Sequence, residues 1–219
     1  MVMQQPGGYN LGAFFKIGQR LTAGINYRSK ILMKVDGGYA TFNVPETLSS
    51  YFPPNNTFTA ELPMPANLTL GVGLKVSDKL LLAFDLQHVR WSEYNELVFD
   101  FKENTAVLED SYNPRNFENT MIYRFGAEYG LLASLKLRAG IYYDETPIPK
   151  DYLTPETPGT NKIGISGGFS WALNNHLSLD ASLLHVSGET RDDGYAPLEF
   201  YGRYESSAWI PGVGLSWSF

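Results

Sequence analysis

Residues 135–144 read LKLRAGIYYD, and this stretch decides the fold. Successive side chains of a β-strand point to opposite faces, so odd and even positions would form two separate surfaces. The odd positions carry only apolar or aromatic side chains, namely Leu135, Leu137, Ala139, Ile141 and Tyr143. The even positions carry Lys136, Arg138, Gly140, Tyr142 and Asp144. The stretch is therefore predicted to be a strand with one apolar and one polar face.

The same alternation recurs along the chain of 219 residues, and no segment shows a helical period. Strands are expected at 8–17, 21–36, 60–76, 80–101, 119–130, 135–145, 162–172, 177–189 and 204–219. The pattern predicts an all-β, antiparallel, up-and-down chain with about nine strands.

The connections between these strands alternate in length. Short turns are expected at 18–20, 77–79, 131–134 and 173–176, and long connections at 37–59, 102–118, 146–161 and 190–203. In an up-and-down sheet, all short turns then fall at one end and all long connections at the other. Short periplasmic turns opposite long extracellular loops are typical of outer-membrane β-barrels. A soluble sandwich would also have apolar faces, but it has no reason to keep this regular asymmetry.

Aromatic residues gather near both ends of the expected strands. Tyr129, Trp171 and Trp217 lie beside short turns, whereas the following lie toward the long connections: Tyr27, Trp91, Tyr94, Tyr143 and Tyr204. Two such belts, one bilayer apart, favour a transmembrane barrel with a polar lumen. The last expected strand ends at Phe219, as outer-membrane barrels commonly do, and this predicts recognition by the barrel-assembly machinery.

Composition excludes several other classes of protein. No run of about 18 apolar residues exists, which argues against helical membrane spans. A net charge of −6 and a pI near 5.1 argue against nucleic acid as a partner. The absence of cysteine excludes disulfides and thiolate metal sites. The opening residues MVMQQP lack the features of a secretory signal, so we expect a mature, truncated or excised part of a protein.

Signs of enzymatic or metal chemistry are weak. A hydrolase would need a histidine paired with a serine and an acid. His185 and Ser187 share a strand face, but Asp180 lies on the opposite one, which favours an interfacial histidine. Residues 192–194 (Asp-Asp-Gly) match a turn better than a calcium loop. We therefore expect no enzyme, no metal and no cofactor.

Several ordered segments resemble the FadL/TodX family of outer-membrane transporters of hydrophobic compounds. The resemblance begins with LPMPANLTLGVG at 62–73 and continues through YRFGAEY at 123–129. LRAGIYYD at 137–144 and the proline-rich ETPIP at 145–149 follow in the same order. The likeness covers about residues 60–219, and residues 1–59 fit more loosely.

This resemblance implies a monomeric, fourteen-stranded barrel whose lumen is plugged by an N-terminal hatch. An odd number of strands cannot close an antiparallel barrel, and each unpaired backbone group in lipid costs several kcal/mol. Residues 1–219 are therefore expected to be a single β-barrel region from the C-terminal part of a larger barrel. The hatch and the early strands would lie outside it.

Charged residues on the polar faces offer candidate ligand contacts. The inward-facing set is Arg28, Lys75, Asp85, Arg124, Glu128, Lys136, Arg138, Asp144 and Asp180. The favoured interpretation is an ion-pair network that satisfies itself, because charges inside a barrel must pair or meet water. The alternative is that an unmatched cation holds a ligand carboxylate, with Arg28, Arg124, Lys136 and Arg138 as candidates. In the long connection, Tyr51, Phe52 and Phe58 are expected either to form an apolar capture surface or simply to pack together.

Together with the resemblance, these features predict passive uptake of a hydrophobic small molecule, such as a long-chain fatty acid, across the outer membrane. Outer-membrane lipid and lipopolysaccharide are the expected surroundings. Two alternatives stay open at this point, namely a structural or adhesive surface barrel and an outer-membrane hydrolase.

Overall fold

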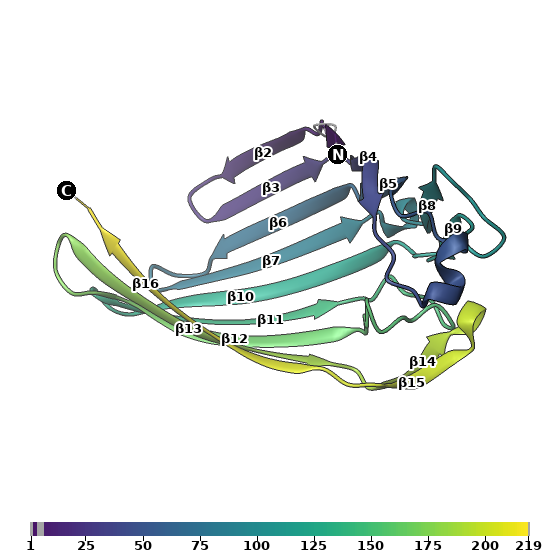
Figure 1. Ribbon diagram of the computed structural model, residues 1–219. Helices are drawn as coiled ribbons and strands as arrows, with labels where there is room; N and C mark the ends of the chain where they lie inside the picture. Colours follow the sequence, from purple (N-terminus) through teal and green to yellow (C-terminus); the bar gives the residue numbers. More distant parts are fainter. Residues whose placement is uncertain (1, 4–6, 219) are drawn as a thin grey trace.

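Nine strands form one continuous antiparallel sheet in the computed structural model, which describes residues 2–3 and 7–218. In spatial order the strands are β2 (Asn10–Ile17), β3 (Leu21–Arg28), β6 (Asn67–Lys75), β7 (Leu80–Val89), β10 (Thr120–Leu132), β11 (Leu135–Asp144), β12 (Lys162–Ala172), β13 (Leu177–Gly188) and β16 (Ser207–Trp217). The sheet, called the wall below, curls into a trough that stays open between β2 and β16 (Figure 1). The predicted all-β class and the nine wall strands are confirmed.

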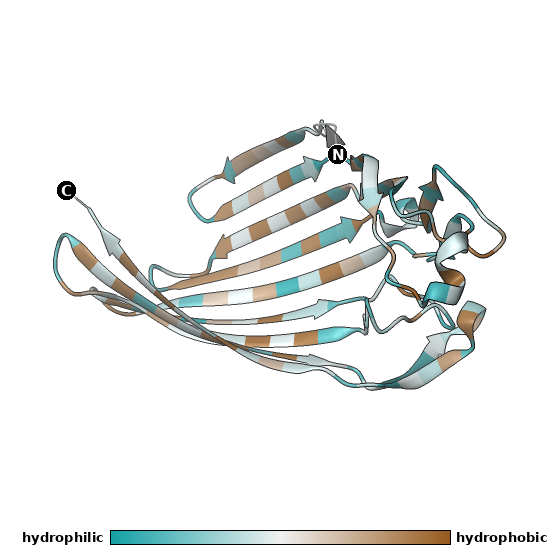
Figure 2. Ribbon diagram, in the orientation of Figure 1, coloured by the Kyte–Doolittle hydropathy of each residue, from teal (hydrophilic) through white to brown (hydrophobic). Residues whose placement is uncertain are grey.

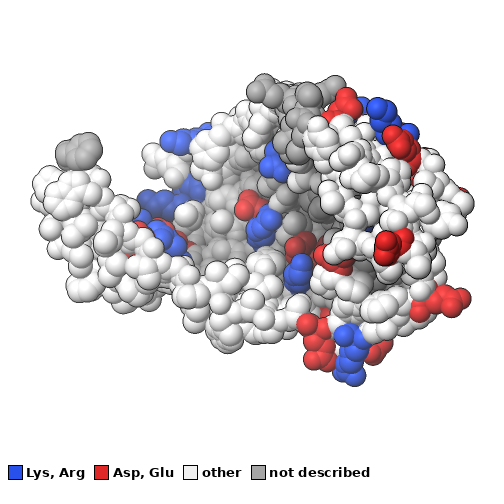
Figure 3. Space-filling view, viewed as in Figure 1, with Lys and Arg blue, Asp and Glu red and all other residues white. Residues whose placement is uncertain are grey.

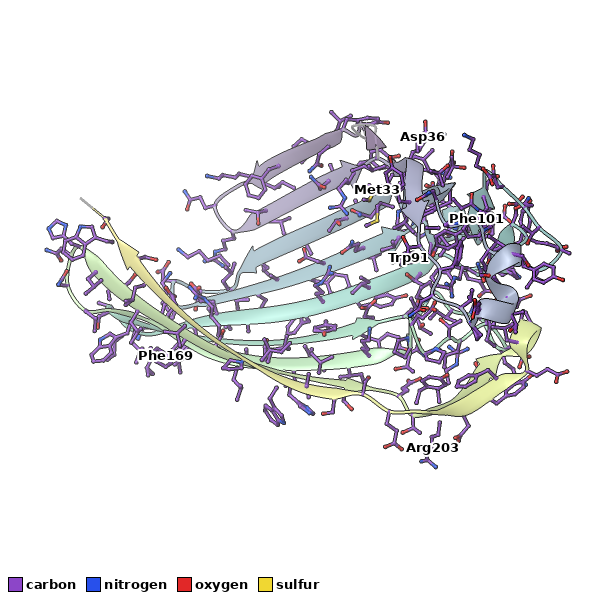
Figure 4. All side chains as sticks on the ribbon, viewed as in Figure 1. Met33, Asp36, Trp91, Phe101, Phe169 and Arg203 are labelled. Atoms are coloured by element: carbon purple, nitrogen blue, oxygen red, sulfur yellow. The ribbon has the colours of Figure 1, made fainter. Side chains whose placement is uncertain are left out.

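The strand register places the charged side chains on one face of the wall. Glu128 lies directly opposite Arg138, and Arg124 lies directly opposite Asp85. The other face carries large exposed apolar residues, among them Leu137 and Val213. Strands therefore appear as alternating bands of hydropathy (Figure 2), and Phe169 projects from the convex outer side (Figure 4). The predicted two-faced wall is confirmed, with the polar face lining the trough.

All four short turns lie at one end of the wall, as predicted (Figure 1). Two of them are closed by side chains that replace missing backbone partners. Ser77 Oγ accepts from the backbone N–H of Leu80 at 3.2 Å, and Asn174 Oδ1 accepts from that of Leu177 at 2.9 Å. In a third, Gly18 has a φ of 65°, a backbone conformation that favours glycine.

Three predicted strands each divide into two, so those boundaries are wrong. The segments 21–36, 60–76 and 80–101 leave the wall at Ser29–Lys30, at Pro65–Ala66 and at Arg90–Asn95. Proline has no N–H to donate to a strand ladder, which accounts for the second break. At the first, Ser29 Oγ accepts from the backbone N–H of Tyr9 at 2.9 Å. The chain then bends into a second sheet at the end of the wall opposite the short turns (Figure 1).

This second sheet, called the cover below, is built mostly from residues predicted as strand, and it extends into the predicted connections at 37–59 and 102–118. It contains β1 (Val2–Met3), β4 (Ile31–Ala40), β5 (Asn56–Met64), β8 (Glu96–Phe101) and β9 (Ser111–Pro114). A separate hairpin follows from β14 (Arg191–Tyr195) and β15 (Phe200–Tyr204). Short 3-10 helices lie at η1 (Glu46–Tyr51), η2 (Trp91–Glu93) and η3 (Ala196–Leu198). Among the described residues, no helix is both long and apolar enough to cross a membrane.

The buried core lies at the end of the wall where the long connections gather. Its centre is Tyr94, Phe117, Ile148 and Leu153, with Trp91, Leu97, Tyr152 and Tyr204 packed against it. The ring centroid of Phe117 lies 5.3 Å from that of Tyr94 and 5.9 Å from that of Trp91. Trp91, Tyr94 and Tyr204 therefore belong to this core and not to the aromatic belt predicted for them.

The β14–β15 hairpin is expected to require glycine at one position and tolerate alanine at another. A Cβ atom at Gly194 would lie 2.1 Å from the backbone oxygen of Phe200, whereas one at Gly202 would approach nothing closer than 3.8 Å. Gly194→Ala should therefore cost about 1–3 kcal/mol through overpacking, and Gly202→Ala almost nothing. The measurement is the folded fraction in outer membranes, read from the mobility of unheated samples in SDS gels. Equal folded fractions for the two variants would contradict this packing.

Candidate functional site

An ion-pair network crosses four strands on the lumen face of the wall. Glu128 on β10 accepts from Lys136 Nζ at 2.9 Å and from Arg138 Nε at 2.8 Å, both on β11. Arg138 Nη1 also donates to Ser170 Oγ at 2.7 Å and lies 3.5 Å from Asp180 Oδ1. Ser170 in turn donates to Asp180 on β13. Basic and acidic side chains adjoin toward the short-turn end of the trough (Figure 3).

Lys136 and Arg138 therefore have carboxylate partners within the wall. Two cations and two acids make the network neutral, and a ligand carboxylate would have to displace Glu128 or Asp180. This geometry favours the self-satisfying ion-pair interpretation for these two residues.

A hollow of about 570 Å³ lies on the lumen face beside this network. Small residues of β12, β13 and β16 line it, including Ser166, Gly168 and Gly212. A Cβ atom at Gly168 would lie 2.6 Å from the backbone oxygen of Ala181, so the close approach of these strands itself requires glycine there. The missing side chains leave open space along the wall.

Two of the predicted cations have no carboxylate partner among the described residues. Arg124 Nη2 donates to the amide oxygen of Gln87 at 2.8 Å and forms no ion pair with a described residue, although Asp85 lies opposite it on β7. Arg28 lies at the end of β3, opposite Asn10 and Asn67, and forms no ion pair with a described residue. These two arginines face the lumen from different strands, and they are the candidates that remain available to an anionic ligand.

The aromatic residues predicted in the long connection are divided between a cluster and the surface. Phe58 packs against Phe99 and Phe101, with ring centroids 5.6 and 6.2 Å apart. Phe52 joins the same group through Phe42, at 5.2 Å. Tyr51 remains exposed. Phe101 lies among the side chains of the cover (Figure 4). This geometry favours packing for Phe52 and Phe58, because much of their surface contacts other rings.

The histidine considered for hydrolysis lies on the lipid-facing side of the wall. His185 Nε2 lies 3.1 Å from Ser207 Oγ on the neighbouring strand, and its ring centroid is 4.3 Å from that of Trp209. Asp180 faces the lumen, where it binds Ser170. The histidine, the serine and the acid are therefore not brought together.

A family model described as "Outer membrane protein transport protein (OMPP1/FadL/TodX)" matches residues 2–219. The chain belongs to this family. A putative outer membrane protein of Neisseria meningitidis serogroup B is 32% identical over 97% of the chain and 50% of the relative. A long-chain fatty acid transport protein of Escherichia coli O6:H1 is 23% identical over 97% of the chain and 49% of the relative.

A solved structure shares the fold of the chain. The FadL homologue of Pseudomonas aeruginosa superposes with a TM-score of 0.83 at 21% identity, over 96% of the chain and 52% of that structure. The chain thus spans about half the length of the relatives that it matches. Family and fold confirm the predicted location in the outer membrane and the transmembrane β-barrel class. The predicted contact at Phe219 lies outside the described residues.

A buried clamp that no sequence pattern indicated joins two of the long connections, and the prediction of a turn at residues 192–194 is wrong. Asp193 lies in β14, where its Oδ1 accepts from the backbone N–H of Asp151 at 2.9 Å and its Oδ2 lies 2.5 Å from Arg191 Nη2. Arg191 also donates to the carbonyl oxygens of Ile148 and Pro149, both at 2.8 Å. The clamp fixes the hairpin against the connection between β11 and β12.

Asp193→Asn is expected to loosen the hairpin at neutral pH. Burial alone would raise the pKa of Asp193, but the N–H groups of Asp151 and Gly194 and the Arg191 guanidinium outweigh it and hold the pKa below its ordinary value. A lowered folded-state pKa gives stability that is present above the ordinary aspartate pKa of about 3.9 and is lost as the pH falls through the folded value.

The measurement is protease cleavage of the extracellular hairpin on intact cells over a range of pH. Asp193→Asn should be cut faster than the parent protein at pH 7, and the difference should shrink below about pH 4. Asp192→Asn is the matched control, because Asp192 is exposed and adjacent. A difference between Asp193→Asn and the parent that stays constant down to low pH would contradict an ionised Asp193 in the clamp.

Proposed function

We propose that this chain forms part of the wall and extracellular cover of an outer-membrane transporter that takes up hydrophobic small molecules such as long-chain fatty acids. The observation that carries the proposal is the lumen face of the wall. Its small residues leave an open hollow, while the charges beside it pair with one another. The E. coli relative is named a long-chain fatty acid transport protein, which supports this substrate class.

The rest of the barrel would come from strands outside these residues. β2 ends at a short turn, and β16 ends opposite the start of β13, so both edge strands run toward the short-turn end. The missing strands must pair antiparallel with both β2 and β16. The first and the last of them therefore both run opposite to these two edges, so the number of missing strands is odd. Five such strands would complete the fourteen that the family resemblance implies, with the hatch in the lumen.

Transport through this barrel would be passive. The cover, with its phenylalanine cluster, stands at the extracellular entrance, and the lumen offers a path below it. A substrate would move down its concentration gradient without covalent chemistry, so we propose a transporter and not an enzyme. Outer-membrane lipid and lipopolysaccharide would surround a monomeric barrel, and the assembly machinery would recognise its last strand.

Arg124 and Arg28 would hold the carboxylate of a fatty acid as it passes through the lumen. Tyr51, exposed at the end of η1, would contact its apolar part. Lys136 and Arg138 would keep the wall neutral, because Glu128 and Asp180 already pair with them.

Uptake of oleate and of toluene tests this proposal in a strain that lacks its own fatty-acid transporter and carries the full-length gene that includes this chain. Both compounds should enter faster than in the empty strain. Arg124→Gln should slow oleate uptake by roughly three- to tenfold, because a charged hydrogen bond is lost, and leave toluene uptake unchanged. Arg203→Gln is the control, since Arg203 is an exposed arginine on the extracellular hairpin.

Failure to take up either compound would overturn the transport function. Equal slowing of oleate and toluene by Arg124→Gln would instead contradict the role of its charge and indicate a general change in the lumen.

A further inference from the structure

Three of the long connections meet around a pocket of about 430 Å³, and none of its lining residues lies in a wall strand. Arg115 follows β9, Thr154 and Glu156 lie between β11 and β12, and Leu198 and Phe200 lie in the β14–β15 hairpin. The pocket is therefore built by segments far apart in the sequence.

A buried arginine lies in this pocket. The Arg115 side chain is only 6% exposed, and its Nη1 donates to Thr154 Oγ1 at 3.1 Å. Its Nη2 donates to Glu156 Oε2 at 3.3 Å, but the Glu156 side chain is 78% exposed. The Nε atom is buried and has no hydrogen-bond partner among the described residues. The guanidinium is thus held on one side and incompletely satisfied on the other.

The unsatisfied edge has the shape of a carboxylate receptor. Nε and Nη2 of an arginine point from the same edge of the guanidinium, and together they can donate to both oxygens of a planar carboxylate. Glu156 occupies only Nη2. Because Glu156 bonds the guanidinium through one nitrogen only and its side chain is 78% exposed, a carboxylate that bonds both nitrogens can replace it and keep the buried charge paired.

The walls of the pocket beyond this edge are apolar and open to solvent. Leu198 is 74% exposed and Phe200 is 50% exposed, which is unusual for large apolar residues grouped on a surface hairpin. Tyr195 is buried beside them, and its hydroxyl donates to the carbonyl oxygen of Pro114 at 3.1 Å. This bond ties the hairpin to the residue that precedes Arg115.

We propose that this pocket binds an amphipathic carboxylate, with the head group on Nε and Nη2 of Arg115 and the apolar tail along Leu198 and Phe200. Glu156 occupies Nη2 in the empty pocket and leaves it when the ligand enters. The site rests on the proposed function only in taking a fatty acid as its ligand.

Fluorescence of cis-parinaric acid, titrated into outer-membrane vesicles that contain the full-length protein, tests the site. Glu156→Gln removes the competing carboxylate and should tighten binding of the acid about three- to fivefold. Leu198→Asp places a negative charge on the apolar wall and should weaken binding about tenfold. Leu198 is exposed, but Glu156→Gln removes the carboxylate partner of a buried arginine, so the folded fraction of each variant is measured first from its mobility in unheated SDS gels. Arg203→Gln, on the same hairpin, should bind as the parent does.

The corresponding alcohol, cis-parinaryl alcohol, separates the head group from the tail. Glu156→Gln should leave its binding unchanged, because an alcohol does not compete with a carboxylate for the arginine edge. Equal tightening of acid and alcohol would overturn the head-group assignment. Binding of the acid that is the same in Glu156→Gln, Leu198→Asp and Arg203→Gln would overturn the site.

Uptake measurements distinguish this site from the proposed transport. If oleate enters the cells but the variants do not alter binding, the pocket assignment fails and transport stands. If the variants alter binding as expected but neither oleate nor toluene enters, transport fails and the pocket stands.

Discussion

Backbone hydrogen bonding in a medium without water is the constraint on which the rest of this structure depends. In hydrocarbon each N–H and C=O group needs a partner within the protein, and strands obtain one only from neighbouring strands. Each wall strand pairs with the next from β2 to β16, with a register shift between Gly130 and Leu132 beside the β10–β11 turn. The break at Pro65 occurs where the chain leaves the wall.

The two faces of the wall follow from the same constraint. Once the backbone is committed to the ladder, side chains can adapt only by alternating between lipid and lumen. Charges on the lumen side then need partners at strand spacing, and Glu128 meets Arg138 directly across the β10–β11 pair. The glycines of the lumen face have a different role, because they leave room for larger groups on neighbouring strands, as Gly164 does for the ring of Tyr142.

The wall was predictable from sequence because period-2 alternation is a local signal that every strand carries. The ends of the wall strands beside the long connections were not predictable. A strand that bends from the wall into the cover keeps the same alternation of apolar and polar residues through Ser29 or Arg90. The site was harder still. Arg115 is defined by Thr154, 39 residues away, and Asp193 by Asp151, 42 residues away. Local turn chemistry at Asp193 was outweighed by these distant contacts, which no spacing in the sequence indicates.

The shared direction of β2 and β16 also constrains how such a barrel can change during evolution. Duplicating or deleting a hairpin changes the number of strands by two and leaves every neighbour antiparallel. A closed barrel that contains these nine strands therefore always has an odd number of further strands, however many hairpins are gained or lost. A single added strand would reverse the chain at the seam, so barrels of this lineage can grow or shrink only in steps that bring the chain back to the same side of the membrane.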